Sequence, residues 1–307
     1  MNGIILIDKP SDFTSFDVVA KMKGMLRTKK IGHAGTLDPM ATGVLPLLVG
    51  KATRAMEILP CSDKEYIAGF KLGTTTDTLD IWGKVLTENS HFSVTKDDLS
   101  AKLVDFTGEI YQIPPMFSAV QKDGVRLYDL ARQGIEVERP AKQVTVYKLE
   151  LISYDEQSGE GVLKVKCSKG TYIRTIIADV GDSLGCGAVM TSLRRTMAAG
   201  FNIDDAMSLE QAQKYCDDNT LANNLMPIER AFELYDCVKV TPAQAKRFVN
   251  GGELALDRVT LPCKSDIYRV KCRNEFLGLG IIKNNNLAVY RLFYSGGGWF
   301  ENYKRVK

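Results

Sequence analysis

Histidine and paired cysteine are scarce in this sequence. It contains two histidines, His33 and His91, and seven cysteines that are scattered with no Cys-x-x-Cys pair. A zinc site needs clustered ligands and a disulfide framework needs regularly spaced cysteines, so we expect neither. Scattered cysteines are instead typical of a protein in a reducing compartment, which predicts a cytoplasmic location.

Long apolar runs and the common cofactor motifs are also missing. No stretch approaches the roughly 18 apolar residues of a membrane-spanning helix, and the opening run at residues 4–7 is too short for a signal peptide. The motifs GxGxxG, GxxxxGK[ST], HExxH and GxSxG, which bind nucleotides or metals or carry a serine nucleophile, do not occur. We therefore expect no membrane association, no metal and no cofactor.

What is present is an ordinary globular composition, with 45% hydrophobic and 25% charged residues over 307 positions. At about 150 residues per domain, this length predicts two domains. We place the boundary near Asp236. Residues 1–236 are expected to form a large mixed α/β (α+β) domain, and residues 237–307 a small β-rich domain with a core of its own.

Hydrophobic periodicity and turn residues place the expected elements along the chain. In the first domain they predict strands at residues 3–7, 44–49, 64–72, 144–154, 160–167 and 187–195, and helices at about 14–26, 95–106, 125–133, 168–184 and 209–216. In the second they predict a helix that starts after Thr241 and strands at 268–272, 277–282 and 287–292. The segment at about 114–142, which opens with Pro114-Pro115, is expected to be an excursion from the first domain.

Charge is unevenly distributed along the chain. Residues 21–54 carry seven basic residues against one acid, residues 237–307 carry thirteen against five, and residues 201–236 carry eight acids against two bases. Two basic regions separated by an acidic one favour two surfaces that meet a polyanion and a segment that faces away from it. The alternative is that the lysines only solvate helix faces.

Asp38 lies in a glycine-rich loop at residues 32–43, inside the more basic part of the first domain and close to His33. A loop that leads into a core strand is a common place for reactive groups. The alternative is a simple turn, because aspartate and proline both favour turns for local reasons.

The sequence around Asp38 resembles the signature of the TruB family of tRNA pseudouridine-55 synthases. The loop reads Gly-His-Ala-Gly-Thr-Leu-Asp-Pro at residues 32–39 and Ala-Thr-Gly-Val-Leu-Pro at 41–46. Further matches are Lys-Glu-Tyr at 64–66, Leu-Gly-x-x-Thr-Asp-Thr-x-Asp-x-x-Gly at 72–83, Pro-Pro-Met-Phe-Ser-Ala at 114–119, Arg-Leu-Tyr-Asp-Leu-Ala-Arg-Gln-Gly at 126–134, Ser-Lys-Gly-Thr-Tyr-Ile-Arg at 168–174 and Leu-Arg-Arg at 193–195. They cover residues 3–196 in the family's order.

The resemblance implies a mixed-sheet pseudouridine synthase catalytic domain with an RNA-clasping insertion at about 114–142, followed by a PUA-like RNA-binding domain. It implies that uridine 55 in the T arm of tRNA is flipped out and isomerised to pseudouridine. This reaction is redox-neutral and consumes nothing, which agrees with the missing cofactor motifs. The implied partner is tRNA, with no protein partner required, and we expect a monomer.

Three residues are implied to carry the chemistry. Asp38 corresponds to the family's nucleophile, since a carboxylate can form a covalent intermediate. Arg174 corresponds to its partner, because a close arginine favours the ionised carboxylate. Tyr66 corresponds to a tyrosine that stacks on the uracil and takes the C5 proton. Without the resemblance, Arg174 would be an exposed residue in the first turn of a helix, and Tyr66 an ordinary strand aromatic.

Three more residues are implied to hold the flipped base. His33 corresponds to the residue that fills the gap left in the RNA, and its alternative is a hydrogen bond that orients the loop. Tyr172 and Leu193 correspond to apolar pocket walls. Asp80 is interpreted as a loop-structuring residue. The chain departs from the family at Gln121, where a lysine is usual; Lys122 follows one position later.

Three other functions compete with this interpretation. One is a catalytically silent RNA-binding or tRNA-folding protein on the same scaffold, which loss of Asp38 or Arg174 would have indicated. Another is a synthase that works within a guide-RNA particle, for which a longer basic tail is expected. The third is a glycoside hydrolase with an aspartate nucleophile, which would need a second carboxylate that no motif supplies.

Overall fold

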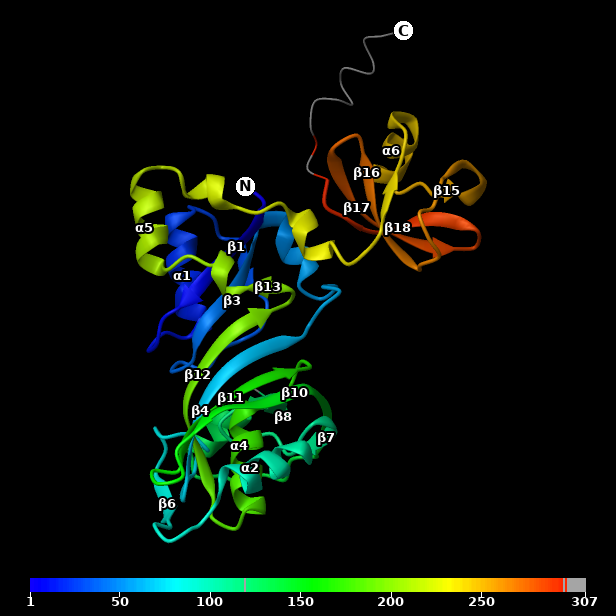
Figure 1. Ribbon diagram of the computed structural model, residues 1–307. Helices are drawn as coiled ribbons and strands as arrows, with labels where there is room; N and C mark the ends of the chain where they lie inside the picture. The colour runs from blue at the N-terminus through cyan, green and yellow to red at the C-terminus, as the bar shows by residue number, and fades with distance from the viewer. Residues whose placement is uncertain (119, 295, 297–307) are drawn as a thin grey trace.

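The computed structural model describes residues 1–118, 120–294 and 296, and within them two main sheets form an elongated molecule (Figure 1). The last residues of the expected second domain, 297–307, lie outside the described residues. The large sheet has the order β1-β3-β12-β4-β11-β10-β7, with β2 beside β3 and β13 beside β12. Its strands are β1 Gly3–Lys9, β2 Ile31–His33, β3 Thr42–Val49, β4 Lys64–Leu72, β7 Gly108–Gln112, β10 Lys142–Tyr154, β11 Glu160–Cys167, β12 Ala188–Ala198 and β13 Phe201–Asn202.

The large sheet is antiparallel except where β3 runs parallel to β12 near its centre. There Arg195 pairs with Gly43, and a Cβ on Gly43 would lie 2.2 Å from the Arg195 carbonyl oxygen. Gly43 also has a φ of +109°, which residues with a side chain rarely adopt. Only glycine therefore lets the loop before β3 lie this close to β12.

Helices cover the large sheet in two groups. Figure 1 shows α1 and α5 beside β1 and β3, and α2 and α4 beside the other half of the sheet. The helices are α1 Ser15–Met25, α2 Lys96–Val104, α3 Leu127–Arg132, α4 Ile173–Ser183, α5 Leu209–Asp217 and α6 Pro242–Val249. Capping boxes start α1 at Thr14, α2 at Thr95, α5 at Ser208 and α6 at Thr241. Because these caps satisfy the first free N–H groups, each helix begins where the sequence predicts.

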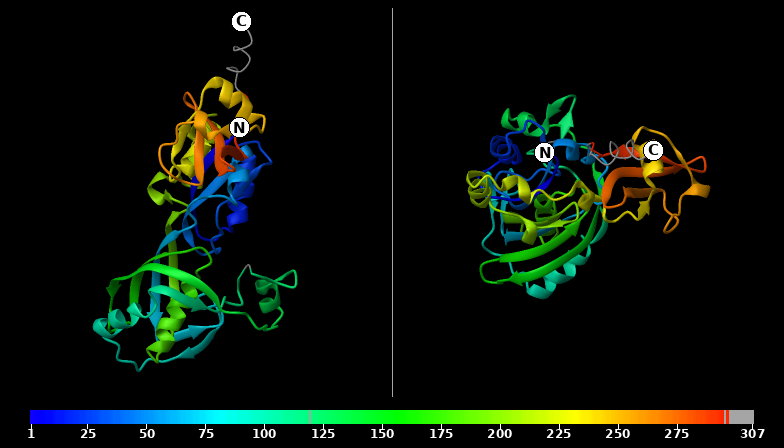
Figure 2. Two further views of the ribbon diagram at one scale, coloured as in Figure 1. Left: turned by 90° about the vertical axis from the view of Figure 1, so that its right-hand side faces the viewer. Right: turned by 90° about the horizontal axis from the view of Figure 1, so that it is seen from above.

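The insertion projects from the lower part of the molecule as a separate lobe, visible in the left-hand view of Figure 2. It contains a small hairpin of β8 Gln121–Lys122 and β9 Val125–Arg126, followed by α3. A second small sheet pairs β5 Thr74–Thr76 with β6 Val85–Glu88.

Two predicted helices begin later than expected, and the backbone gives the reason. The helix expected from residue 125 begins at Leu127, because Asp123 and Gly124 have positive φ values of 53° and 82° and close the β8–β9 hairpin first. The helix expected from residue 168 begins at Ile173, since Gly170 has a φ of +86°. A residue in the left-handed region cannot be part of a right-handed helix, so in both places the helix begins only after it.

The C-terminal part forms a five-stranded sheet in the order β14-β16-β17-β18-β15. Its strands are β14 Cys237–Lys239, β15 Leu254–Ala255, β16 Ile267–Cys272, β17 Glu275–Lys283 and β18 Asn286–Leu292. Figures 1 and 2 show it packed against the upper end of the large sheet. The three strands and the helix expected here are present, and α6 packs on them.

The C-terminal part has a buried cluster of its own, which includes Val238, Phe248 and Tyr268, but a further cluster joins the two sheets where they meet. One buried cluster contains Ile4 and Leu6 of β1 together with Phe232, Leu279 of β17 and Phe293. The opposite face of β1 packs on α1 and α5. Both faces of β1 are therefore buried, which explains why its sequence is continuously apolar.

The acidic segment also contacts the basic C-terminal part. Glu229 accepts from Arg269 at 2.9 Å and from Lys271 at 2.8 Å, and the three side chains are about four-fifths buried. Arg269 and Lys271 are thus paired with a carboxylate of the same chain. This part of the acidic segment does not face away from the basic surface.

We expect Phe232→Ala to destabilise the joint between the two sheets. Phe232 is fully buried, with its ring 5.3 Å from that of Phe293 and 6.2 Å from that of Phe276. Its removal should cost about 3 to 5 kcal/mol of unfolding free energy, measured by urea denaturation followed by circular dichroism. Leu234→Ala is the matched control, since Leu234 is 73% exposed and its loss should change stability by less than about 0.5 kcal/mol. Equal stability of the two variants would contradict this account.

Candidate active site

The loop between β2 and β3 carries Asp38, and buried side chains hold its backbone. The Ser15 hydroxyl accepts from the Leu37 amide at 2.8 Å and donates to the Leu37 carbonyl at 3.2 Å. The Lys9 ammonium, which is fully buried, donates to the Pro39 carbonyl at 2.9 Å. Burial lowers the pKa of Lys9 to about 8, although the negative charge of Asp38 acts in the opposite direction. The backbone on both sides of Asp38 is therefore fixed.

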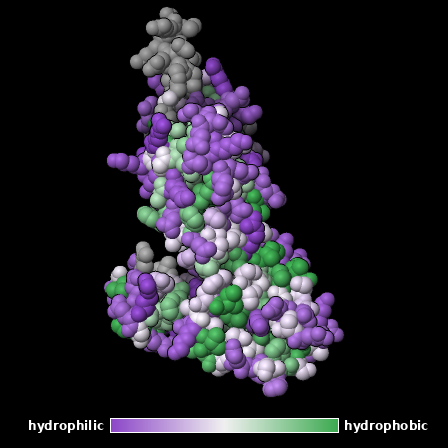
Figure 3. All heavy atoms as spheres, turned by 90° about the vertical axis from the view of Figure 1, so that its left-hand side faces the viewer, coloured by the Kyte–Doolittle hydropathy of each residue, from purple (hydrophilic) through white to green (hydrophobic). Residues whose placement is uncertain are grey.

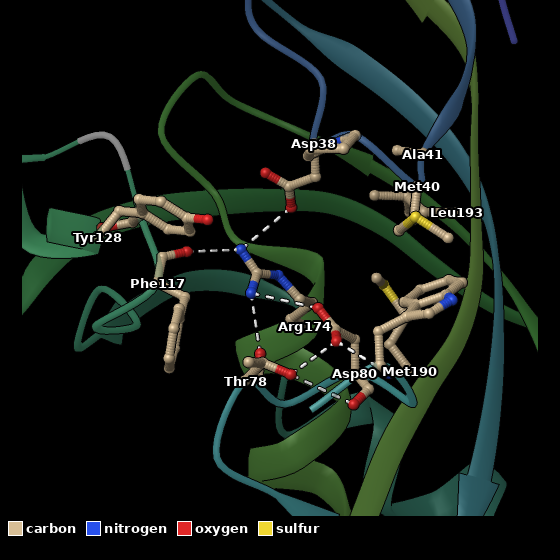
Figure 4. A pocket seen from close by; sticks show the side chains of 13 residues that line it. Asp38, Met40, Ala41, Thr78, Asp80, Phe117, Tyr128, Arg174, Met190 and Leu193 are labelled. Carbon is tan, nitrogen blue, oxygen red and sulfur yellow. Dashed lines mark hydrogen bonds and ion pairs between the residues drawn. The ribbon is translucent and has the colours of Figure 1, made fainter. Parts of the chain in front are cut away.

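Arg174 lies in the first turn of α4 and is 5% exposed, so it is buried. Its Nη2 is 3.0 Å from the Asp38 carboxylate and its Nη1 is 3.4 Å from the Asp80 carboxylate. The same nitrogens donate to the backbone carbonyls of Phe117 at 2.9 Å and Thr78 at 2.8 Å (Figure 4). The Asp38 side chain remains 48% exposed. The site thus combines a rigid buried cation with a carboxylate that a substrate can reach.

Asp80 contributes more than the sequence indicates. As expected it structures its own turn, accepting from the Thr78 hydroxyl at 2.6 Å and the Trp82 amide at 3.3 Å. It also contacts Arg174, which makes it a second acidic partner of the same guanidinium. The signal was present in the Thr-Asp-Thr-x-Asp string at residues 76–80, but nothing in that string specifies Arg174 as the partner.

A cavity of about 280 Å³ opens beside the ion pair. Five of the six predicted site residues line it: Asp38, Tyr66, Tyr172, Arg174 and Leu193. They come from the β2–β3 loop, β4, the start of α4 and β12. The fold therefore brings residues from four distant segments around one space that has aromatic and aliphatic walls and a carboxylate on one side.

The two tyrosines are held differently. Tyr66 is 6% exposed, and burial raises its pKa to about 12, although the neighbouring Arg195 acts to lower it. Tyr172 caps α4, and its backbone is clamped by Gln112, whose amide donates to the Tyr172 carbonyl at 3.2 Å and accepts from the Tyr172 amide at 3.0 Å. Gln112 is almost fully buried at 2% exposure, and no feature of the sequence distinguished it.

His33 does not line this cavity. It lies at the end of β2, where its Nδ1 is buried without a hydrogen-bond partner among the described residues. Burial, followed by the charge of Arg195, lowers the pKa of His33, so its imidazole is neutral at pH 7. The structure therefore places His33 next to the catalytic loop but outside the cavity walls.

A second cavity of about 260 Å³ shares Asp38, Arg174 and Leu193 with the first. Its walls include Met40, Trp82 and Tyr128, and Figure 4 shows Met40 and Tyr128 on opposite sides of the pair. Trp82 is 46% exposed. Exposed aromatic rings beside a cavity suit stacking on a nucleic-acid base.

Gln121 and Lys122 both lie in β8 and are exposed. The Lys122 ammonium donates to the Glu138 carbonyl at 3.1 Å, within the insertion. Neither residue lines the two cavities beside Asp38.

Comparison with family models covers most of the chain. Residues 23–173 match the N-terminal domain of TruB family pseudouridylate synthase. Residues 174–233 match the C-terminal domain of tRNA pseudouridylate synthase B, and residues 237–293 match the C-terminal domain of pseudouridine synthase II TruB.

Individual relatives agree with these matches. The chain is 40% identical over 295 residues to tRNA pseudouridine synthase B of Clostridium kluyveri, which covers 95% of this chain and 100% of that protein. It is 42% identical to tRNA pseudouridine synthase B of Azoarcus sp., covering 97% of each chain. Among solved structures, a chain from a Cbf5-Nop10-Gar1 complex superimposes with a TM-score of 0.73 and 27% identity, covering 95% of this chain and 85% of that one. The chain belongs to the TruB family and is a pseudouridine synthase, with the mixed α/β fold that its sequence predicts.

Proposed function

We propose that this enzyme isomerises uridine 55 in the T arm of tRNA to pseudouridine, with Asp38 as the nucleophile. The observation that carries the proposal is the 3.0 Å contact between Arg174 and a half-exposed Asp38 at the mouth of an apolar cavity. The choice of tRNA is supported by relatives at about 40% identity, whose names specify tRNA. The choice of position 55 rests on the family signature in the Asp38 loop.

The reaction breaks the bond between N1 of uracil and C1′ of the ribose, turns the base, and joins C5 to C1′. N1 gains a proton and C5 loses one, so atoms and charge balance without a co-reactant. A carboxylate that forms a covalent intermediate divides this exchange into two easier steps. Asp38 suits the role because one side of its carboxylate is held by Arg174 while the rest faces the cavity.

Arg174 supports the nucleophile by position and by charge. Four acceptors hold its guanidinium, so it does not need to reorganise when the substrate enters. It is buried, and charge interactions are stronger away from water. A cation fixed beside Asp38 compensates the negative charge of its carboxylate in a site that must also accept RNA phosphates nearby.

The cavity suits a base that has left its stack. Flipping costs a few kcal/mol, which stacking and hydrogen bonds in the pocket must offset. Tyr66, Tyr172 and Leu193 supply the apolar surface. Tyr66 is also proposed to take the C5 proton. His33, neutral and outside the cavity, remains a candidate for filling the gap in the RNA, since it lies beside the loop rather than within the pocket.

The surface outside the cavity is proposed to hold the RNA backbone. Figure 3 shows hydrophilic residues over the upper part of the molecule, while apolar residues gather in the lower part near the insertion. The basic stretch at residues 21–54 and the C-terminal sheet belong to the upper part. Basic stretches of the chain together with a pocket for a base fit a substrate that needs both phosphate contacts and an inserted base. The C-terminal part, residues 237–307, is accordingly proposed to be a PUA-like RNA-binding domain.

We expect Asp38→Asn to fold normally, bind a T-arm hairpin and form no detectable pseudouridine, because an amide has the shape of the carboxylate but is a poor nucleophile. The measurement is pseudouridine content after incubation with excess enzyme, with binding followed separately. Asp12→Asn, an exposed aspartate outside the cavities, serves as the control and should retain wild-type activity. Turnover by Asp38→Asn within tenfold of wild type would show that Asp38 is not the nucleophile.

Arg174→Ala should reduce the single-turnover rate by roughly 10²-fold, since leaving a buried partner unpaired costs about 3 kcal/mol. RNA affinity should change little. Arg174→Lys should recover only part of the rate, because a point charge cannot serve four acceptors arranged around a planar fork. A weaker affinity with an unchanged single-turnover rate would make Arg174 a phosphate contact instead.

The purified chain alone should convert the hairpin, without a partner protein or cofactor, because all the groups of the proposed site come from one chain and isomerisation consumes no co-reactant. The hairpin is used because its folding depends little on Mg²⁺, so EDTA can be added without unfolding it. Activity that requires a second protein would instead favour an assembly like that of the Cbf5-Nop10-Gar1 complex. Normal binding without conversion would indicate the catalytically silent alternative.

A further inference from the structure

Arg195 is a fully buried cation without an acidic partner. Its exposed fraction is 0%, and no carboxylate within residues 1–118, 120–294 and 296 lies at ion-pair distance from it. The preceding residue, Arg194, has the surroundings expected of an arginine: its side chain is 46% exposed and pairs with Asp8 at 2.7 Å. Burying a charge is expensive unless its hydrogen bonds are satisfied. The environment of Arg195 must therefore supply acceptors of another kind.

Those acceptors are backbone carbonyls of the catalytic loop. The Arg195 Nη2 donates to Gly35 at 3.1 Å, and its Nη1 donates to Thr36 at 3.1 Å. Its Nε donates to Val44, in the strand that follows the loop, at 2.9 Å. One planar guanidinium thus holds both ends of the segment that carries Asp38.

The loop is shaped around this side chain. Gly35 has a φ of +95°, and a Cβ added there would lie 3.5 Å from the Arg195 Nη1 and 3.3 Å from Lys64. The backbone of Arg195 in turn lies against Gly43, where a Cβ would come within 2.2 Å of it. Gly43 therefore permits close contact between the loop and the strand that carries Arg195, and Gly35 permits the left-handed backbone conformation of the loop.

Arg195 also lies next to residues that line the cavity beside Asp38. It is the direct cross-strand neighbour of Tyr66. Its charge acts to lower the pKa of the Tyr66 hydroxyl. Thr36 and Tyr66 line the cavity beside Asp38, whereas Arg195 does not. Any effect of Arg195 on the reaction must therefore pass through the residues that it holds.

We propose that Arg195 is a positioning residue, whose guanidinium fixes the loop at residues 35–44 and so places Asp38 against the target base. The proposal rests on the proposed function, in which Asp38 attacks the substrate. A carboxylate that must reach a reacting carbon gains rate from accurate placement, and small displacements reduce that rate without abolishing binding. A buried cation that hydrogen-bonds only neutral groups is suited to this task, because it fixes the loop without forming an ion pair that competes with the one between Arg174 and Asp38.

The test uses the full-length chain and two readouts. The first is the single-turnover rate at saturating T-arm hairpin, with the dissociation constant measured separately. The second is amide hydrogen exchange of the peptide covering residues 33–41, which needs no substrate and no activity. The variants are Arg195→Lys, which keeps the charge but loses the planar fork, and Arg195→Met. Arg194→Lys and Arg194→Met are the matched controls, because residue 194 lies on the opposite face of the same strand.

Arg195→Lys should fold, exchange the loop amides at least tenfold faster and react at least tenfold more slowly, with a dissociation constant within threefold of wild type. Arg195→Met should react still more slowly, at least 10²-fold below wild type, so that the lysine variant counts as a partial rescue. Both Arg194 variants should match wild type in rate and exchange.

Rate and exchange within twofold of wild type in Arg195→Lys would overturn the proposal, whether or not Arg195→Met folds. Unchanged loop exchange combined with weaker RNA binding would also overturn it, because Arg195 would then affect the RNA and not the loop. The proposed function can fail separately. A wild-type chain that forms no pseudouridine would refute that function, while faster loop exchange in Arg195→Lys alone would still support the role in holding the loop.

Discussion

The Arg174 guanidinium is the interaction on which the site depends. It joins α4 to the loop of Asp38, the turn at residues 78–80 and the stem of the insertion at Phe117. These segments lie up to 136 residues from Arg174 in sequence, so none of them finds its place through local propensity. A planar group with five N–H donors is satisfied only when all its acceptors are in position. The Asp38–Arg174 pair and the attachment of the insertion are consequently parts of one hydrogen-bonded unit.

The two buried arginines, Arg174 and Arg195, have acceptors of different kinds. Arg174 contacts two carboxylates, so its charge is compensated, and it lies beside a half-exposed Asp38. Arg195 contacts backbone carbonyls of residues 35, 36 and 44, and its proposed contribution is to the shape of the loop. Desolvating each charge is costly, and each is retained with its hydrogen-bonding capacity largely used. Arg174 thereby takes part in charge compensation, and Arg195 is proposed to hold the geometry of the loop.

The joint between the two sheets changes how the charge pattern should be understood. Because Phe232 and Phe293 lie in one cluster with β1, the C-terminal sheet is packed on the catalytic part and not merely tethered to it. Glu229 pairs with two cations at the same joint and compensates part of their charge. The acidic segment therefore compensates part of the positive charge of the C-terminal part. The positive charge left for contacts with RNA is smaller than the number of basic residues in the sequence indicates.

The sequence by itself determined the local features. The helices expected at about 14–26 and 95–106 and the strands expected at 144–154 and 160–167 depend on neighbours a few residues away, and the structure confirms them. The family motifs identified the family, and five of the six residues that they pointed to line one cavity in the structure. Only the tertiary structure decided that Arg195 is buried, that Asp80 shares Arg174 with Asp38, and that the two sheets share a core. A charged or polar residue in a sequence is expected at the surface, and its burial depends on acceptors contributed by segments more than 90 residues away. Those acceptors exist only after the sheet has formed.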